Sequence, residues 1–277
     1  MTDIDTLLSI AHEAVDLGRQ LMRTMQPTAT TAKGDRDIVT DVDYAVERQI
    51  RAMLAQQTPD IDFLGEEEGG RGAQAERLTW CLDPVDGTTN FAHGSPLCGI
   101  SLALLDGPHA VIGVIDLPFL DLRYHATEHS GAFCGTNRIA VSTTRRLHDA
   151  VVAIGDFAVG DGAEDKNRLR VGAANRLAER AQRVRMHGSA AIDLAWLADG
   201  RVDAMTMLAS NNPWDTAAGV LIAREAGAHI VDRHGQPHTT SSTDVIGANP
   251  DLLTELLDLV HDTAVASVTA NPGVSSA

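Results

Sequence analysis

Apolar residues near the N-terminus return with the spacing of amphipathic helices. Over residues 3–25 they recur every three or four positions, and Pro27 then stops the pattern, so we expect a helix with one buried face. The same spacing returns over residues 46–54, shortly after Thr40 and Asp41, either of which can cap a helix. The pattern therefore predicts two consecutive helices.

Short apolar runs without helical spacing follow, and they predict β-strands. Asp106 and Gly107 supply a turn signal between two of them, so part of this region is expected to form an antiparallel meander. The predicted strands are residues 61–64, 80–82, 100–105, 111–115 and 122–125.

Beyond about residue 145, strands and helices alternate, which is typical of an α/β arrangement. Gly227 suits the C-terminal cap of one helix, while Asn249 and Pro250 mark the start of the last helix, which is expected to end near His261. The predicted strands are 151–154, one near Val184, and 202–207, and the predicted helices are 166–181, 190–198, 214–226 and 250–261.

No internal repeat and no low-complexity linker divides the chain. We therefore expect two layers of one compact unit and not two independent domains. An N-terminal α+β half, residues 1–145, carries most of the candidate metal ligands, and an α/β half, 146–262, completes the site. Residues 263–277 are expected to be a disordered tail, because the segment from 266 onward has no periodicity.

Composition and charge narrow the possible functions. The 277 residues are 44% hydrophobic and 22% charged, as in folded proteins. Lys and Arg number 22 against 38 Asp and Glu, a formal net charge of −16, so most of the surface repels nucleic-acid phosphates and anionic lipids. We expect neither nucleic-acid binding nor membrane insertion, since no apolar run approaches the roughly 20 residues of a membrane span.

The cysteines indicate a reducing compartment. Cys81, Cys98 and Cys134 are odd in number and lack C-x-x-C spacing, which suits neither a disulfide framework nor a zinc site. The N-terminal segment carries acids where a secretory signal would carry Lys or Arg. We assign the cysteines no chemistry and expect a cytoplasmic protein.

The histidines offer no metal pattern. His234 and His238 flank a glycine and a proline, so they cannot share a helical face as a zinc pair would, and both are expected at the surface. His93 and His187 adjoin the motifs described below and could line the rim of a pocket. Trp214 is expected to pack as a hydrophobic anchor.

Residues 80–91 concentrate the candidate chemistry. An apolar strand leads into Asp83 and Asp86, and Pro84, which has no N–H for a strand ladder, is expected to end that strand. Two carboxylates there can share hard cations. Gly87 allows close approach of a ligand, and Thr88 can begin a helix whose free N–H groups suit a phosphate. The alternative is an ordinary turn, since Asp, Pro and Gly are common turn residues.

Further carboxylates lie elsewhere in the chain. Glu66, Glu67 and Glu68 follow another predicted strand, where the alternative is a solvated run of charge. Asp215 starts an apolar helix, where the alternative is an interaction with the helix dipole. No nearby run of Lys or Arg neutralises these acids together, and bound cations would relieve their repulsion.

The motifs LGEE, DPVDGTTNF and PWD, in this order and separation, resemble the three metal-binding motifs of the inositol monophosphatase family. The resemblance spans about residues 7–259 and includes KGDRDIVTDVD and HGSAAIDLAWLADGRVDA. It implies the layered αβαβα sandwich of inositol monophosphatases and fructose-bisphosphatases. It also implies a homodimer and a lithium-sensitive phosphatase that uses two to three Mg²⁺ ions on a small phosphorylated substrate.

Carried over residue by residue, the resemblance implies the metal ligands. Glu66, Asp83 and the carbonyl of Val85 would hold the first Mg²⁺. Asp83, Asp86 and Asp215 would hold the second, and Glu66 with waters a weaker third. Oxygen ligands suit this ion.

The resemblance also implies supporting and substrate-binding roles. Thr88, held by Asp43, would orient the attacking water that the metal activates, and Glu67 would support the site. Lys33 would lie near the metal and water cluster, although a solvated charge in the expected loop 33–37 is the alternative. The implied substrate-binding residues are Asp86, Gly87, Thr88, Gly188, Ser189, Ala190 and Asp215, and for the HGSAA residues tight helix packing is the alternative.

One departure from the family pattern bears on the substrate. Inositol-preferring members have a glutamate seven residues before the helix aspartate, and this chain has Leu208 there. The site would then lack that acceptor for a polyol, unless Asn211 or Asn212 substitutes. Inositol 1-phosphate remains the first expectation. The alternatives are fructose 1,6-bisphosphate, another sugar phosphate, histidinol phosphate, or a regulatory binding protein on the same fold.

Overall fold

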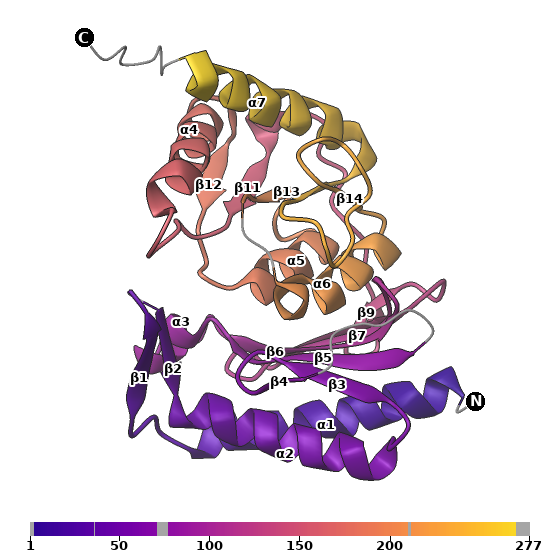
Figure 1. Cartoon of the computed structure of the whole chain (residues 1–277). Helices are drawn as coiled ribbons and strands as arrows, with labels where there is room; N and C mark the ends of the chain where they lie inside the picture. The colour runs from indigo at the N-terminus through magenta and orange to yellow at the C-terminus, as the bar shows by residue number, and fades with distance from the viewer. Residues whose placement is uncertain (1–2, 36, 71–76, 210–211, 270–277) are drawn as a thin grey trace.

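The computed structural model describes residues 3–35, 37–70, 77–209 and 212–269 as five alternating layers of helices and sheets (Figure 1). Two helices cover one face of a large sheet, two more separate this sheet from a smaller one, and another two cover the outer face of the smaller sheet. The expected αβαβα sandwich is confirmed. Within the described residues, no helix combines the length and the apolar composition that crossing a bilayer requires.

The first layer consists of α1 (Ile4–Thr24) and α2 (Asp41–Gln57). Along α1 the buried positions recur every three or four residues, as the spacing predicted. The Thr40 hydroxyl accepts a hydrogen bond from the backbone N–H of Val42 at 3.2 Å, and so caps α2. Both helices pack on the large sheet (Figure 1).

The large sheet has eight strands in the order β10-β9-β8-β7-β6-β5-β3-β4. From β5 to β10 each strand pairs with its sequence neighbour in antiparallel fashion, which is the expected meander, while β3 runs parallel to β5. The strands are β3 (Asp62–Gly65), β4 (Gly69–Gly70), β5 (Leu78–Asp86), β6 (Gly99–Asp106), β7 (His109–Leu117), β8 (Leu122–Thr127), β9 (Ala132–Cys134) and β10 (Asn137–Arg138).

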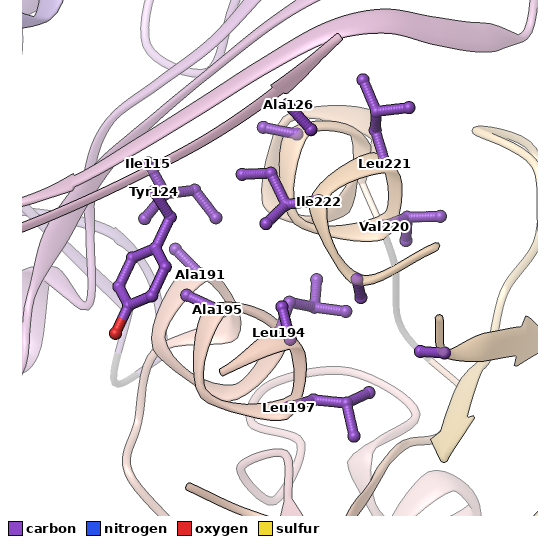
Figure 2. Packing of buried hydrophobic residues seen from close by; sticks show 14 of the residues in the cluster. Ile115, Tyr124, Ala126, Ala191, Leu194, Ala195, Leu197, Val220, Leu221 and Ile222 are labelled. Carbon is purple, nitrogen blue, oxygen red and sulfur yellow. The ribbon is translucent and has the colours of Figure 1, made fainter. Parts of the chain in front are cut away.

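The middle layer holds α5 (Ala190–Ala198) and α6 (Pro213–Glu225), which are apolar on nearly every side. Figure 2 shows Leu194, Leu197 and Ile222 of these helices among side chains of the large sheet such as Ile115 and Tyr124. Because both sheets bury these helices, their N-terminal ends are fixed in position. Those ends carry site residues.

The smaller sheet has the order β12-β11-β13-β15-β14, and its outer face is covered by α4 (Ala163–Arg180) and α7 (Pro250–Thr269) (Figure 1). Strands β12, β11 and β13 run parallel, and β15 pairs antiparallel with both β13 and β14. The strands are β11 (Val151–Ile154), β12 (Arg183–Arg185), β13 (Ala204–Met207), β14 (His229–Val231) and β15 (Val245–Ala248). A 3₁₀ turn, η1 (Leu147–Asp149), and a short helix, α3 (Thr88–Ala92), complete the elements.

Three sequence expectations were wrong. The expected loop over residues 33–37 is wrong for the described residues at both of its ends, because β1 (Thr30–Gly34) and β2 (Asp37–Thr40) form an antiparallel pair there. Strand β5 does not end at Pro84. It continues to Asp86, and its pairing with β6 is irregular between Asp83 and Asp86, where a proline needs no ladder bond. Helix α7 runs to Thr269, so residues 263–269 are helical; the rest of the expected tail, 270–277, lies outside the described residues.

Candidate active site

Three carboxylates from distant parts of the chain meet at one point. Glu66 follows β3, Asp83 lies in β5, and Asp215 lies in the first turn of α6. One oxygen of each lies within 4.8 Å of the others. The sequence analysis had selected all three, and the fold brings them together.

The parallel pairing of β3 with β5 explains how Glu66 reaches Asp83. Gly65 pairs with Leu82, and the backbone N–H of Glu66 donates to the Leu82 carbonyl at 3.2 Å. Glu66, at the end of β3, therefore lies beside Asp83 of the longer strand β5. In the irregular part of β5, the backbone N–H of Val85 donates to Asp83 Oδ1 at 3.0 Å and fixes that carboxylate.

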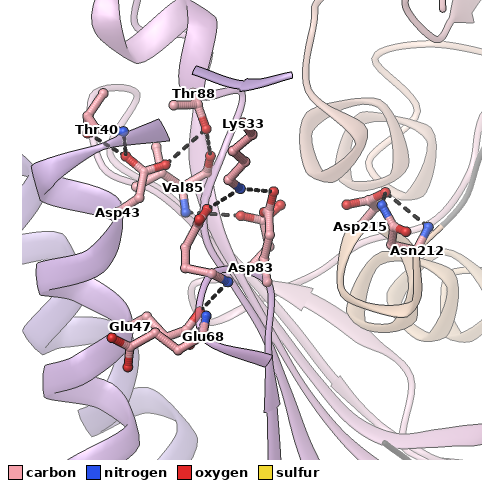
Figure 3. Close-up of polar contacts among 12 residues, drawn as sticks. Lys33, Thr40, Asp43, Glu47, Glu68, Asp83, Val85, Thr88, Asn212 and Asp215 are labelled. Atoms are coloured by element: carbon pink, nitrogen blue, oxygen red, sulfur yellow. Dashed lines mark hydrogen bonds and ion pairs between the residues drawn. The ribbon is translucent and has the colours of Figure 1, made fainter. Parts of the chain in front are cut away.

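Glu47 of α2, which the sequence analysis missed, holds the acidic turn after β3 (Figure 3). Its carboxylate accepts from the backbone N–H groups of Glu67 at 2.8 Å and Glu68 at 3.0 Å, and it pairs with Arg51 at 2.6 Å. A Cβ at Gly65 would lie 2.4 Å from the Glu47 carboxyl carbon. The LGEE motif therefore needs its glycine, because a fully buried carboxylate packs against it.

Lys33 is not a solvated loop charge, because its ammonium group bridges two of the glutamates (Figure 3). Its Nζ lies 2.9 Å from Glu66 Oε1 and 2.6 Å from Glu67 Oε1. Burial acts to lower the pKa of Lys33, but the hydrogen bond to Glu67 and the charge of Glu66 outweigh it, so Lys33 stays protonated. Burial also raises the pKa of Glu67 to about 7 against the pull of Lys33.

Among the described residues, no lysine or arginine forms an ion pair with the deeper carboxylates Asp83, Asp86 and Asp215. Burial, and then the charges of Glu66, Asp86 and Asp215, raise the pKa of Asp83 well above its usual range. Burial is also the main cause that raises the pKa of Asp86 to about 7 and that of Asp215 to about 6. Several oxygen donors that repel one another in a buried place fit a hard divalent cation.

Thr88 and Asp43 form the second part of the site (Figure 3). The Thr88 hydroxyl lies 3.0 Å from Asp43 Oδ1 and 3.0 Å from the Val85 carbonyl. Asp43 Oδ2 accepts from both the backbone N–H of Thr40, at 3.1 Å, and the Thr40 hydroxyl. Asp43 is thereby fixed at the start of α2, and Thr88 is held beside the acids.

Asp86 contacts α5 directly. Its carboxylate accepts from the Ser189 hydroxyl and from the backbone N–H groups of Ala190 at 3.1 Å and Ala191 at 3.0 Å. Ser189 also caps α5 through the N–H of Ile192. The tight helix start considered as an alternative for HGSAA is therefore present, and the same residues still line the cavity described next.

These groups surround a cavity of about 330 Å³. The sequence analysis had selected ten of its lining residues, Glu66, Asp83, Val85, Asp86, Gly87, Thr88, Gly188, Ser189, Ala190 and Asp215. It missed four others, Gly155, Asp156, Asp193 and Met207. Asp193 lies within the HGSAAIDLAWLADGRVDA motif but was given no role, and no motif marks the other three, which enter the cavity through strand ends that only the fold brings together.

Leu208 does not line this cavity, which agrees with the expectation that it offers no acceptor for a polyol there. It is 3% exposed and packs with Ile154, Leu169 and Ala173 in a separate apolar cluster. Met207 precedes it and does line the cavity, so the next side chain points to the other side. Asn211 and Asn212 were considered as replacements for the missing polyol acceptor, and Asn211 lies outside the described residues.

Asn212 and Trp214 lie at the start of α6. Asn212 donates from its backbone N–H and its side-chain Nδ2 to Asp215 Oδ2, at 3.1 and 3.2 Å (Figure 3). Asp215 therefore also stabilises the N-terminal end of α6, in keeping with the structural role that was considered as the alternative to metal binding. Trp214 packs against the core of the middle layer, as expected.

One expectation about the histidines was wrong. His238 is 2% exposed, not at the surface, and burial lowers its pKa to about 4. His187 is largely buried, and its Nδ1 lies 2.6 Å from Asp193 Oδ1, so this ring is fixed to the wall of the cavity. Cys81, Cys98 and Cys134 are free thiols.

Comparison with known proteins agrees with this geometry. A family model described as "Inositol monophosphatase family" matches residues 3–265. The probable inositol 1-monophosphatase ImpA of Mycobacterium tuberculosis is 35% identical over 233 residues, 84% of this chain and 85% of that protein. A fructose-1,6-bisphosphatase/inositol-1-monophosphatase of Thermotoga maritima is 34% identical over 229 residues, 83% of this chain and 84% of that protein. The solved structure of a Thermotoga maritima IMPase superposes with a TM-score of 0.86 at 30% identity, over 95% of this chain and 100% of that one.

A five-layer fold with carboxylates clustered at one cavity is typical of a class of metal-dependent phosphatases. The chain belongs to the inositol monophosphatase family. It is therefore a phosphoric monoester hydrolase.

The raised pKa values predict how pH and cations affect stability together. Because the folded-state pKa values of Asp215 and Asp86 lie at about 6 and about 7, above the usual 3.8, their protonation stabilises the ion-free fold at low pH. That stabilisation is lost as the pH rises through 6 to 7. A saturating divalent cation should therefore raise Tm by about 5 °C or more at pH 8, and hardly at pH 5.

Thermal unfolding from pH 5 to pH 8, with and without the cation, measures this difference. Asp106→Asn, which alters an exposed residue at the end of β6, should leave the pH-dependent shift intact, whereas Asp83→Asn should abolish it. Equal shifts at both pH values would show that cations do not replace protons on these acids.

Proposed function

We propose that the protein hydrolyses a small phosphomonoester with the help of Mg²⁺, and that inositol 1-phosphate is its first candidate substrate. The observation that carries this proposal is the meeting of Glu66, Asp83 and Asp215 beside the Thr88–Asp43 pair at one cavity. Metal-assisted hydrolysis requires carboxylates that can bind cations. It also requires a group, here the Thr88 hydroxyl, that can orient the attacking water beside them.

The donor set fits Mg²⁺, because every candidate ligand is an oxygen. Glu66, Asp83 and the Val85 carbonyl would hold one ion, and Asp83, Asp86 and Asp215 a second. Glu66 with waters would hold a third. When bound, the ions supply Lewis-acid activation of water and neutralise negative charge on the phosphate.

The residues of the chain then orient the reactants. When Thr88 donates its proton to Asp43, its lone pairs can accept a hydrogen bond from the attacking water. The backbone N–H groups of Gly87 and Thr88 at the cavity wall would receive the phosphate, and Lys33 keeps Glu66 and Glu67 in place. No covalent intermediate with the protein is needed.

The identity of the alcohol rests on the relatives. The Mycobacterium tuberculosis protein bears the name of an inositol 1-monophosphatase, which supports inositol 1-phosphate. The Thermotoga maritima relative carries both names, which supports fructose 1,6-bisphosphate as the second candidate. A purely regulatory binding protein would have no need for mutually repelling acids in a buried place.

We also propose a homodimer in the cytoplasm. Among the described residues, six large hydrophobic side chains are exposed. Three of them, Phe157, Val159 and Val171, belong to α4 or to the segment before it, and Met186 follows β12, which packs against α4. A second copy could cover them. The three free thiols are compatible with a reducing compartment.

A phosphate-release assay with inositol 1-phosphate tests the activity. Release should stop in excess chelator and return with Mg²⁺. Asp83→Asn should lower kcat/KM by about 100-fold or more, because even the outer partners of a metal site contribute about 10- to 100-fold. Asp106→Asn serves as the matched control. Full turnover without divalent cation would contradict the proposal.

A second assay addresses the water-orienting hydroxyl. Thr88→Ala should lower kcat by roughly 100-fold and change KM little, because the hydroxyl acts on the water in the transition state. Thr88→Ser, which retains the hydroxyl, should recover most of the loss. If Thr88→Ala has the wild-type kcat, Thr88 takes no part in the reaction.

A further inference from the structure

Asp156 lies on a wall of the cavity that no sequence motif predicted. This wall is formed by the residues after β11, the end of β13 and the first turn of α5, which bring Asp156, Met207 and Asp193 to the same space. Gly155 N–H donates to the Thr206 carbonyl at 2.9 Å, so the chain leaves β11 in a fixed direction. Asp156 follows immediately.

The backbone of Asp156 is anchored, while its carboxylate is available to a ligand. Arg170 Nη1 donates to the Asp156 backbone carbonyl and Nε to the Leu208 carbonyl, both at 2.7 Å. The Asp156 side chain makes no hydrogen bond or ion pair with the described residues. The other acid of this wall, Asp193, is paired with His187 at 2.6 Å.

Gly188 leaves space beside this carboxylate. It has a φ of 72°, and a Cβ there would lie 3.5 Å from Asp156 Oδ2 and 3.0 Å from Asn90 Nδ2. Gly188 and Asp156 thus form adjoining parts of the cavity wall. Leu208 points into the core, so Asp156 can provide the acceptor that Leu208 cannot.

The negative charge of this wall distinguishes substrates with a second phosphate from substrates with a hydrogen-bond donor. No lysine or arginine lines the cavity within the described part of the chain. The cations would neutralise the acids of the metal site, and His187 accompanies Asp193. The charge of Asp156 is offset only in part, by the charge of Arg170, which forms no ion pair with it. A second phosphate on the substrate would meet that charge, whereas a hydroxyl or ammonium group could donate to it.

We propose that Asp156 is a specificity-determining residue that accepts a hydrogen bond from a donor on the alcohol part of the substrate and repels a second anionic group. The inference rests on the proposed phosphatase activity of this cavity and deepens it. It assigns the enzyme to phosphomonoesters of polyols or amino alcohols and not to sugar bisphosphates. The donor in these substrates is a hydroxyl or an ammonium group.

The substrate preference of Asp156 variants tests the inference. The kcat/KM of wild type, Asp156→Asn and Asp156→Ala is measured with inositol 1-phosphate, histidinol phosphate, fructose 1,6-bisphosphate and 4-nitrophenyl phosphate. The last compound has a leaving group without a donor, so it reports the chemistry of the metal site alone. Asp161→Asn removes the same charge from an exposed turn outside the cavity lining and serves as the matched control.

Relative to 4-nitrophenyl phosphate, Asp156→Ala should lower kcat/KM for the better of the two donor substrates by roughly three- to tenfold. It should raise kcat/KM for fructose 1,6-bisphosphate by roughly as much. Asp156→Asn keeps an acceptor without the charge, so it should retain activity on a polyol, lose it on an amino alcohol, and show the same gain with the bisphosphate. Asp161→Asn should change none of these ratios.

Two results separate failure of the inference from failure of the proposed function. If 4-nitrophenyl phosphate is hydrolysed with Mg²⁺ but Asp156 variants change all substrates equally, Asp156 does not select substrates. A wild-type preference for fructose 1,6-bisphosphate over both donor substrates would overturn the inference as well. If wild type hydrolyses none of the four compounds, the proposed activity itself is wrong.

Discussion

Asp83 is a buried carboxylate whose nearest charged neighbours are other carboxylates, and much of the surrounding structure can be explained by that constraint. Glu66 and Asp215 come close to it, and no side-chain cation pairs with it in the described residues. Such a cluster needs a fold that holds it rigidly, and either protons or a cation must compensate its charge. The supports around it, Glu47 under the acidic turn and the Val85 N–H on Asp83, provide that rigidity.

The layered fold supplies this rigidity from both sides. Helices α5 and α6 are buried between two sheets, so the start of α5, which holds Asp86, and the start of α6, which carries Asp215, cannot move independently of β5. The pair of strands β1 and β2 brings Lys33 to Glu66 and Glu67, which lie 33 and 34 residues further along the chain. Thus the site depends on contacts between segments more than 100 residues apart, although its ligands lie in short motifs.

The sequence predicted those parts that local physics determines. The apolar runs predicted β11 and α5 with the same bounds that the structure has. The motifs identified the acids that meet at the cavity. Strands β9, β10 and β14 were missed because two or three residues carry no detectable alternation. The β1–β2 hairpin was missed because its first strand is exposed and polar.

Other parts could not be predicted, because they depend on the tertiary structure. Glu47 lies on a helix face that resembles an ordinary charged surface, and only the packing of α2 places it under the turn after β3. Asp156 has no motif around it, and it reaches the cavity through the direction of β11. The direction of Leu208 depends on strand alternation, so sequence position alone showed that it offers no acceptor but not that its side chain packs away from the cavity.

The central claim is that this acidic cluster is a cation site at the centre of a phosphatase. Crystals grown with Mn²⁺, an anomalously scattering substitute for Mg²⁺, test it most directly. The account predicts an anomalous peak bound directly by carboxylate oxygens of Glu66, Asp83 and Asp215. It would be contradicted by well-ordered side chains at full Mn²⁺ saturation with no anomalous peak among them.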